Sequence, residues 1–240
     1  MVFFIHLMKT GGSSFRHTLR QNFSSGEVFP DPDYDEMRTA YLHVSALDQL
    51  SDARRSGIAA VAAHFPFYAT NLVDGPLFKL TVLRDPVERT ISHLKHSKRH
   101  NQRHSESSLE EIYDDPWVFL MEIRDFQSKV FSIEPEDGAG SSGLATVIDV
   151  IDVDERRLRN AKANLETVDL IGLHEDYTGF LGQVSMRLGW STEDVPRLRA
   201  GETGSNVSES FRRRIAEDNE ADMEFYAFAR ALVAERAETV

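Results

Sequence analysis

The sequence predicts an α/β fold in three layers, with helices on both faces of a central, mostly parallel sheet. Four short runs of the chain are almost continuously apolar, which is typical of parallel strands that are buried on both faces. Segments with a helical spacing of apolar residues lie between and after these runs. Because strands alternate with helices along the chain, a three-layer α/β domain is the expected architecture.

The expected strands cover residues 2–7, 59–63, 78–83 and 169–173. Helical spacing predicts helices over residues 13–22, 87–100, 116–131, 154–166, 177–188, 208–217 and 221–237. Two segments rich in Gly, Ser and Pro are expected to be loops, one at about residues 22–35 and one at residues 134–143. A length of 240 residues favours a single domain that spans residues 1–240.

Composition excludes several classes of protein. The chain has 27 Lys and Arg against 39 Asp and Glu, a net charge of −12, so its long-range field repels nucleic acids and anionic membranes. It has no cysteine, which excludes disulfides, thiolate nucleophiles and cysteine-ligated zinc. No run reaches the about 18–20 apolar residues of a membrane span. Because the first residues are typical of a strand and not of a signal peptide, we expect a cytoplasmic protein.

The loop after the first expected strand has the composition of an anion site. It contains Lys9, Thr10, Gly11, Gly12, Ser13 and Ser14, and a helix follows. Glycines allow a tight turn, and backbone N–H groups at a helix start bind phosphate well. A plain strand–helix turn with Ser13 as N-cap is the alternative, and Lys9 favours the phosphate site. The loop is not a Walker A motif, in which the lysine follows the last glycine.

A second motif follows the third expected strand. Arg84 stands at the strand end, Pro86 suits the first turn of a helix, and Ser92 lies two turns further on. An arginine fork and a serine hydroxyl are suited to hold one phosphate group. The alternative is that Arg84 pairs with Asp85 or Glu88 and that Ser92 is an ordinary residue of the helix surface.

Together the two motifs, Lys-Thr-Gly-Gly-Ser-Ser and Leu-Arg-Asp-Pro-x-x-Arg-x-x-Ser, resemble those of the sulfotransferases that use 3′-phosphoadenosine-5′-phosphosulfate (PAPS). The likeness is strongest to the carbohydrate branch, which includes heparan- and chondroitin-type enzymes and bacterial relatives. It implies a P-loop-like sulfotransferase fold. It also implies that the loop from Lys9 to Ser14 binds the 5′-phosphosulfate, that Arg84 and Ser92 bind the 3′-phosphate, and that no metal is required.

Weaker likenesses extend over most of the chain. Residues 63–67 resemble a His-Phe-Pro-Phe segment of the family, and residues 170–175 resemble a late family strand that ends in Gly-Leu-Thr-Glu. Residues 201–206 and the two helices after them resemble the usual C-terminal region. One departure is Met8, because the family commonly has proline just before the lysine.

Sulfuryl transfer needs a cation for the leaving group and a base for the acceptor hydroxyl. Lys9 is the expected cation. His64 is the first candidate for the base because it ends a strand at the edge where ligands bind in parallel sheets. Its alternative role is that of a capping or core-edge histidine. His43 and a carboxylate of residues 31–36, such as Asp33, are further candidates, whereas His6 is expected to be buried.

Four histidines, His93, His96, His100 and His104, are spaced to share one helix face, a pattern that suits a transition metal. The chemistry implied by the resemblance needs none. Residues 79–104 also hold seven Lys and Arg against two acidic residues. This basic segment favours an anionic cofactor or acceptor, and a solvated helix face is the alternative interpretation.

Three hypotheses for function follow. The first is an enzyme that transfers sulfate from PAPS to a hydroxyl of a carbohydrate or glycolipid. The second is a P-loop-type small-molecule kinase or other phosphotransferase, and the third is a non-catalytic nucleotide-binding module. The acceptor is expected to bind to variable loops, at residues 22–41, 65–75 and 135–143. The sequence predicts neither a nucleic-acid partner nor a transmembrane segment.

Overall fold

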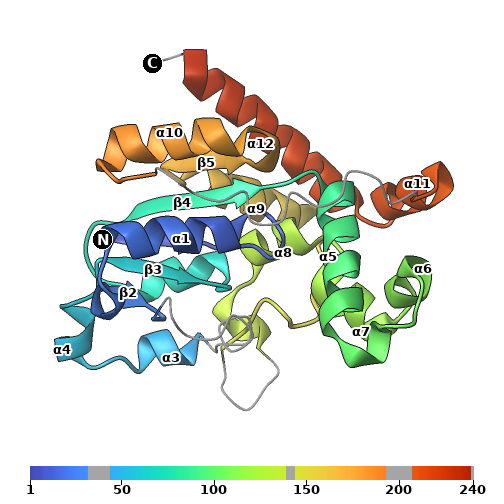
Figure 1. Cartoon of the computed structure of the whole chain (residues 1–240), viewed down its shortest axis with the longest axis horizontal. Helices are drawn as coiled ribbons and strands as arrows, with labels where there is room; N and C mark the ends of the chain where they lie inside the picture. Colours follow the sequence, from blue (N-terminus) through green and yellow to red (C-terminus); the bar gives the residue numbers. More distant parts are fainter. Residues whose placement is uncertain (32–43, 139–143, 193–206, 239–240) are drawn as a thin grey trace.

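The sheet has five strands in the order β2-β3-β1-β4-β5, as seen in a computed structural model that describes residues 1–31, 44–138, 144–192 and 207–238 (Figure 1). The pairings between these strands are all parallel, so the carboxyl ends of the strands lie at one edge. The strands are β1 (Val2–Ile5), β2 (Val28–Phe29), β3 (Ala60–Ala63), β4 (Phe78–Leu83) and β5 (Leu170–Leu173).

The four apolar runs form β1, β3, β4 and β5, which confirms the predicted strands to within two residues at their ends. The short strand β2 lies inside the segment that was expected to be a loop. It pairs with β3 through Val28 opposite Ala60 and Phe29 opposite Val61. Two residues are too few to produce a recognisable pattern, so this edge strand escapes prediction.

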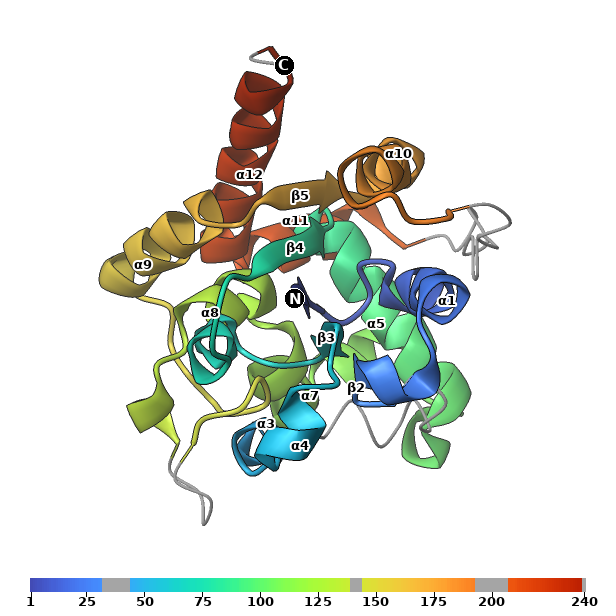
Figure 2. The same ribbon diagram turned by 90° about the vertical axis from the view of Figure 1, so that its left-hand side faces the viewer.

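Helices cover both faces of the sheet, which confirms the three-layer α/β fold (Figure 2). One face carries α1 (Gly12–Asn22) and α10 (Tyr177–Leu188), whose Phe15 and Phe180 pack in one cluster with Phe4 of β1. The other face carries α8 (Phe126–Ser132), α9 (Glu155–Glu166) and α12 (Glu220–Glu238). Two further short helices, α3 (Ser45–Asp48) and α4 (Asp52–Arg55), precede β3.

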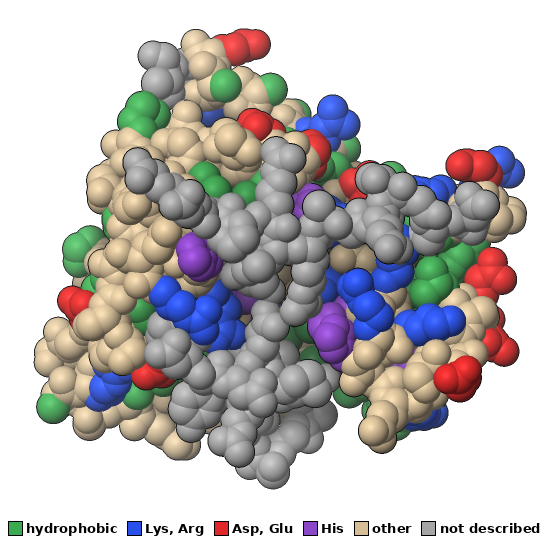
Figure 3. Space-filling model, viewed as in Figure 1, with side chains coloured by type: hydrophobic (Ala, Val, Ile, Leu, Met, Phe, Trp, Pro, Cys, Tyr) green, Lys and Arg blue, Asp and Glu red, His purple; other side chains and the backbone are tan. Residues whose placement is uncertain are grey.

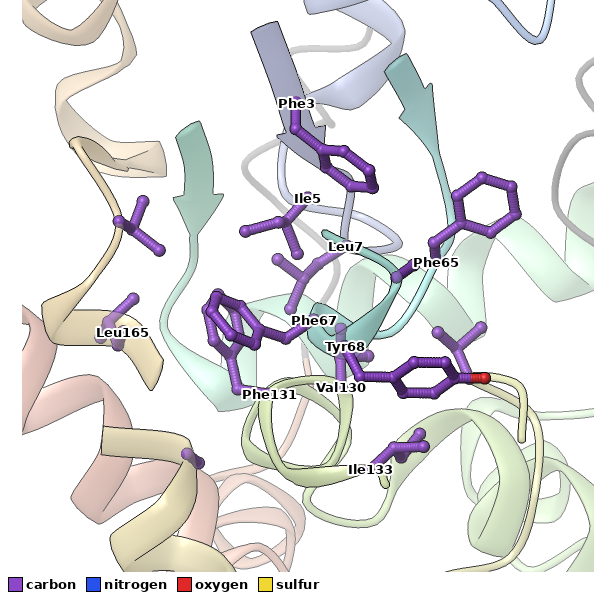
Figure 4. Packing of buried hydrophobic residues seen from close by; sticks show 14 of the residues in the cluster. Phe3, Ile5, Leu7, Phe65, Phe67, Tyr68, Val130, Phe131, Ile133 and Leu165 are labelled. Carbon is purple, nitrogen blue, oxygen red and sulfur yellow. The ribbon is translucent and has the colours of Figure 1, made fainter. Parts of the chain in front are cut away.

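The larger core cluster lies between the sheet and α8, α9 and α12 (Figure 4). Phe3 and Ile5 point to this side and are fully buried, as the alternation of side chains along β1 requires. The rings of Phe67 and Phe131 stack with centroids 5.6 Å apart. Burial of each such side chain contributes about 1.5–3 kcal/mol to the free energy of unfolding, and it fixes the strands whose ends carry the polar residues described below.

A separate cluster forms around α5 (Pro86–His100), which starts where β4 ends. The Asp85 carboxylate accepts the Glu88 N–H at 3.0 Å and caps the helix. Ile91 and Leu94 of α5 pack with apolar residues of α6 (Leu109–Tyr113), α7 (Pro116–Val118) and α11 (Glu209–Glu217). The strand β4 and this cap therefore fix the position of Arg84, which lies between them.

The single helix predicted over residues 116–131 is wrong. The chain instead forms α7, then a π-helix (Phe119–Ile123), a reversal at Asp125 with φ 45°, and α8. Two buried cations satisfy carbonyl groups at the end of the π-helix. Arg89 Nη2 donates to Glu122 O at 2.8 Å and to Ile123 O at 3.2 Å, and Lys129 Nζ donates to Met121 O at 2.7 Å.

The other predicted helices are confirmed with end shifts of one residue or none, as α1, α5, α9, α10, α11 and α12. A 3-10 helix (Pro135–Asp137) begins the segment expected to be a loop at residues 134–143, and residues 139–143 lie outside the described part. Within the described ranges, no helix combines the length and apolar character needed to cross a membrane.

Candidate functional site

The candidate site lies at the carboxyl edge of the sheet, where three of the predicted residues follow three neighbouring strands. Lys9 follows β1, His64 follows β3 and Arg84 follows β4. The Arg84 side chain reaches the first loop, where its Nη1 donates to Lys9 O at 3.1 Å. His64 Nδ1 lies 2.7 Å from His6 O at the end of β1. The structure thus brings together the two motifs and the candidate base.

The loop after β1 adopts an unusual backbone conformation. Lys9 has φ 70° and Gly11 has φ 112°, both in the region that favours glycine. Gly11, and not Ser13, is the N-cap of α1, and a glycine offers no side chain to cap the helix. The first turn of α1 contains no acidic residue. The positive end of the helix dipole therefore faces the loop without a neutralising carboxylate.

The hydroxyl of Thr10 is used inside the loop. Thr10 is fully buried, and its Oγ1 donates to Leu7 O at 3.0 Å. The N–H groups of Ser14 and Phe15 donate to Gly11 O at 3.1 and 3.2 Å. The helix donors left for an anion are therefore the N–H groups of Gly12 and Ser13, which have no partner within the helix.

Gly12 is required by a neighbouring side chain. A Cβ atom at Gly12 would lie 1.5 Å from His6 Nε2, because the His6 imidazole occupies the space above the first residue of α1. Gly11 is restricted as well, since a Cβ there would lie 2.9 Å from the Tyr177 ring. The two glycines thus serve close packing around the loop as well as its turn.

His6 and His64 form a pair of imidazole rings with centroids 4.0 Å apart and planes tilted by 31°. A carbonyl oxygen only accepts, so the contact with His6 O assigns the proton of His64 to Nδ1 and leaves Nε2 as the proton acceptor. Burial, followed by nearby positive charge such as that of Arg16, lowers the pKa of His6 well below its usual value. His6 is therefore neutral, and its expected burial is confirmed.

Arg84 does not pair with the acidic residues beside it in sequence. Glu88 Oε1 lies 2.6 Å from Arg212 Nη1, and Asp85 caps α5. The Arg84 side chain is half-buried, and burial lowers its pKa, against the opposing charges of Glu88 and Asp85. A partly desolvated guanidinium at a loop rich in N–H donors is suited to an anionic ligand.

The remaining residues of the second motif differ in their surroundings. Arg89 is fully buried and supports the π-helix, so its role is structural. Ser92 is half-buried on α5, and no hydrogen bond of its side chain is found within the described ranges. Ser92 lies two turns from the start of α5.

The four spaced histidines do not converge on one point. His93 Nε2 lies 2.8 Å from Glu122 Oε2 in the core. His96 and His100 have ring centroids 4.5 Å apart, and His104 Nδ1 lies 2.6 Å from Ser97 Oγ. In the part of the chain that the structure describes, no group of three or more His, Cys, Asp and Glu is arranged to hold a metal ion.

Several residues at this edge had no role predicted from the sequence. His174 follows β5, and burial, followed by the charge of Arg84, lowers its pKa to about 4. Tyr177 Oη donates to Gly11 O at 3.3 Å, and Arg16 on α1 contributes charge near His6. The sequence of residues 170–175 gave a hint of their importance, because it resembles a late strand of the sulfotransferase family. The sequence around Arg16 gave no such hint.

Lys, Arg and His side chains gather near the middle of one face of the molecule (Figure 3). A pocket of about 900 Å³ lies elsewhere, at the amino edge of the sheet, where Val2, Ala59 and Phe78 contribute to its lining. It is separate from the candidate site. Of the other predicted residues, His43, Asp33 and residues 201–206 lie outside the described part.

No family model matches the chain, and no curated protein matches it significantly. The two motifs and the geometry that joins them are therefore the observations that bear on function.

Proposed function

We propose that this protein is a sulfotransferase that moves the sulfuryl group of PAPS to a hydroxyl of a carbohydrate or glycolipid. One observation carries the proposal, the 3.1 Å hydrogen bond from Arg84 Nη1 to Lys9 O. It joins the two motifs that resemble the family, although they are 75 residues apart in the chain. Neighbouring parallel strands bring the two loops to one edge of the sheet, and this bond brings the Arg84 guanidinium against the first loop.

The charges at the site match a ligand with two anionic groups. Lys9 and the N–H groups at the start of α1 would hold the phosphosulfate at the 5′ position. Arg84, with the Ser92 hydroxyl, would hold the phosphate at the 3′ position. The absence of an acidic residue from the first turn of α1 and the half-buried guanidinium of Arg84 both fit this assignment.

PAPS supplies the activated sulfuryl group, and residues of the chain assist its transfer. His64 Nε2 accepts the proton of the acceptor hydroxyl while the hydroxyl oxygen bonds to sulfur and the bond from sulfur to the phosphate oxygen breaks. Lys9 stabilises the negative charge that grows on that phosphate oxygen. His6 holds His64 through its carbonyl group and its neutral ring.

Binding of nucleotides tests the proposal without knowledge of the acceptor. Adenosine 3′,5′-bisphosphate should raise the unfolding temperature more than AMP, ATP or GTP at equal concentration, because a ligand that binds only the folded state stabilises it. Calorimetry should give a much lower Kd for the bisphosphate than for AMP. Equal affinities would contradict the proposal, and a preference for ATP would favour a kinase.

A binding module is distinguished by a second measurement. A panel of carbohydrate and glycolipid hydroxyls is incubated with PAPS, and release of adenosine 3′,5′-bisphosphate is followed. Release that depends on the acceptor supports transfer. Tight binding of the bisphosphate without release for any acceptor of these classes would favour the non-catalytic module.

A further inference from the structure

The side chain of Gln127 holds both backbone groups of Arg84. Gln127 Oε1 accepts the Arg84 N–H at 3.0 Å, and Gln127 Nε2 donates to Arg84 O at 2.8 Å. Gln127 is fully buried in the first turn of α8. Because β4 ends at Leu83, Arg84 is the first residue beyond the strand ladder. One buried amide therefore supplies the partners that a neighbouring strand would otherwise give.

Gln127 is itself held by a buried carboxylate. Its N–H donates to Asp222 Oδ2 at 3.0 Å, and the N–H and Oγ of Ser128 both donate to Asp222 Oδ1 at 2.7 Å. Asp222 is almost fully buried. The bond to Asp222 therefore fixes the backbone of Gln127, and with it the base of the side chain that holds Arg84.

We propose that Gln127 is a positioning residue that sets Arg84 for a 3′-phosphate, an inference that rests on the proposed function. The guanidinium ends a long and flexible side chain, so its place depends on where its backbone is fixed. Gln127 fixes the backbone, and the bond to Lys9 O fixes the far end. A displacement of about 1 Å at a binding group is enough to cost up to about 10²-fold in function.

The test compares two ligands that differ only in the 3′-phosphate. The Gln127→Met variant keeps a similar volume in the core but removes both bonds to Arg84. Calorimetry gives the Kd of adenosine 3′,5′-bisphosphate and of AMP for each protein. We expect the preference for the bisphosphate to fall by at least about tenfold, with little change in the affinity for AMP.

Ser128→Ala is the matched control. It removes the Oγ bond to Asp222 from the same buried network but leaves both bonds between Gln127 and Arg84. It should retain the wild-type preference even if its unfolding temperature falls as much as that of Gln127→Met. If Gln127→Met and Ser128→Ala are equally stable but only Gln127→Met loses the preference for the bisphosphate, the loss comes from the position of Arg84 and not from lower stability.

Two results would overturn the inference. One is a Gln127→Met protein with the wild-type preference, and the other is an equal loss of preference in Ser128→Ala. If Gln127→Met does not fold, Gln127→Glu serves instead, since it keeps the acceptor for the Arg84 N–H and loses the donor to Arg84 O. A wild-type protein without any preference for the bisphosphate would refute the proposed function itself.

Discussion

Asp125 and Asp222 exchange caps between the N-termini of two helices. Asp125 Oδ1 accepts the Asp222 N–H in the first turn of α12 at 3.0 Å. The Asp222 carboxylate in turn accepts the N–H groups of Gln127 and Ser128 in the first turn of α8. The two residues are 97 positions apart. Each carboxyl stands at the positive end of the other residue's helix, so the pair locks α8 to α12 behind the candidate site.

This pair predicts that stability falls as pH rises towards neutrality. Burial, followed by the charge of Asp222, raises the pKa of Asp125 to about 7. In the unfolded chain the group titrates near its usual pKa of about 4. Between these values the folded state binds a proton that the unfolded state does not, so the free energy of unfolding decreases as pH increases through this window. Below it, both states are protonated and the contribution is constant.

Asp125→Asn should remove this decrease. Asparagine keeps the oxygen that accepts the Asp222 N–H and tolerates the positive φ at this position. At pH 8 the variant should be more stable than wild type by up to about 4 kcal/mol. Urea unfolding of both proteins from pH 4 to pH 8 measures the difference. Parallel curves would show that the titration belongs to another buried group, such as Asp222, whose pKa burial also raises.

The strands were predictable because their burial on both faces leaves a local signature in the sequence. The break in residues 116–131 leaves no such signature. It depends on Arg89 from α5 and on Asn219, whose Oδ1 accepts the Asp125 N–H at 2.9 Å from 94 residues away. A search for helical spacing detects the apolar side chains on either side of the break and registers neither of these distant partners.

Lys9, His64 and Arg84 were predictable for a related reason. Parallel strands end at one edge, so polar residues that directly follow apolar runs meet there. The contact between the His6 and His64 rings depends on which strands are neighbours in the sheet. The two bonds from Gln127 depend on how α8 packs against the sheet. Spacing within one segment encodes neither. Gly12 was predictable only in part. Its place in the loop was evident from the sequence, but the His6 imidazole above it was not.

Gly12→Ala should destabilise the protein. The new Cβ would overlap the His6 ring, with three ring atoms within 2.3 Å. That ring is held between Phe4 at 5.3 Å and His64 at 4.0 Å, so it has little room to move. A loss of about 1–3 kcal/mol is expected from overpacking, measured by urea unfolding.

Gly182→Ala is the control for Gly12→Ala. Gly182 is an exposed residue within α10 with no atom within 4 Å of the added Cβ. This variant should gain about 1 kcal/mol from helix propensity. If the two substitutions change the free energy of unfolding equally, the His6 ring moves aside without a loss of stability.

Lys9→Ala should lower the turnover number by about 10²–10³-fold, as expected for one electrostatic stabiliser of a transition state. The affinity for adenosine 3′,5′-bisphosphate should change less, because the lysine acts most on charge that grows during transfer. Both residues at this position adopt the same positive φ, so backbone strain cancels in the comparison. Turnover is measured by bisphosphate release from PAPS. A near-normal turnover number would show that Lys9 has no role in catalysis.

His64→Ala should lower the rate by about 10²–10⁴-fold and leave the affinity for adenosine 3′,5′-bisphosphate nearly unchanged, because the general base acts on the acceptor and not on the nucleotide.

His64→Asn sharpens the test. An asparagine amide at this position is able to donate to His6 O, as Nδ1 does now at 2.7 Å, but it offers no basic nitrogen in place of Nε2. If proton transfer is the role of His64, the Asn variant is as slow as the Ala variant. If the histidine only shapes the site, the Asn variant recovers most of the rate. In that event His43→Ala and Asp33→Ala, assayed with the same acceptor, identify the base, and the sulfotransferase proposal stands without His64.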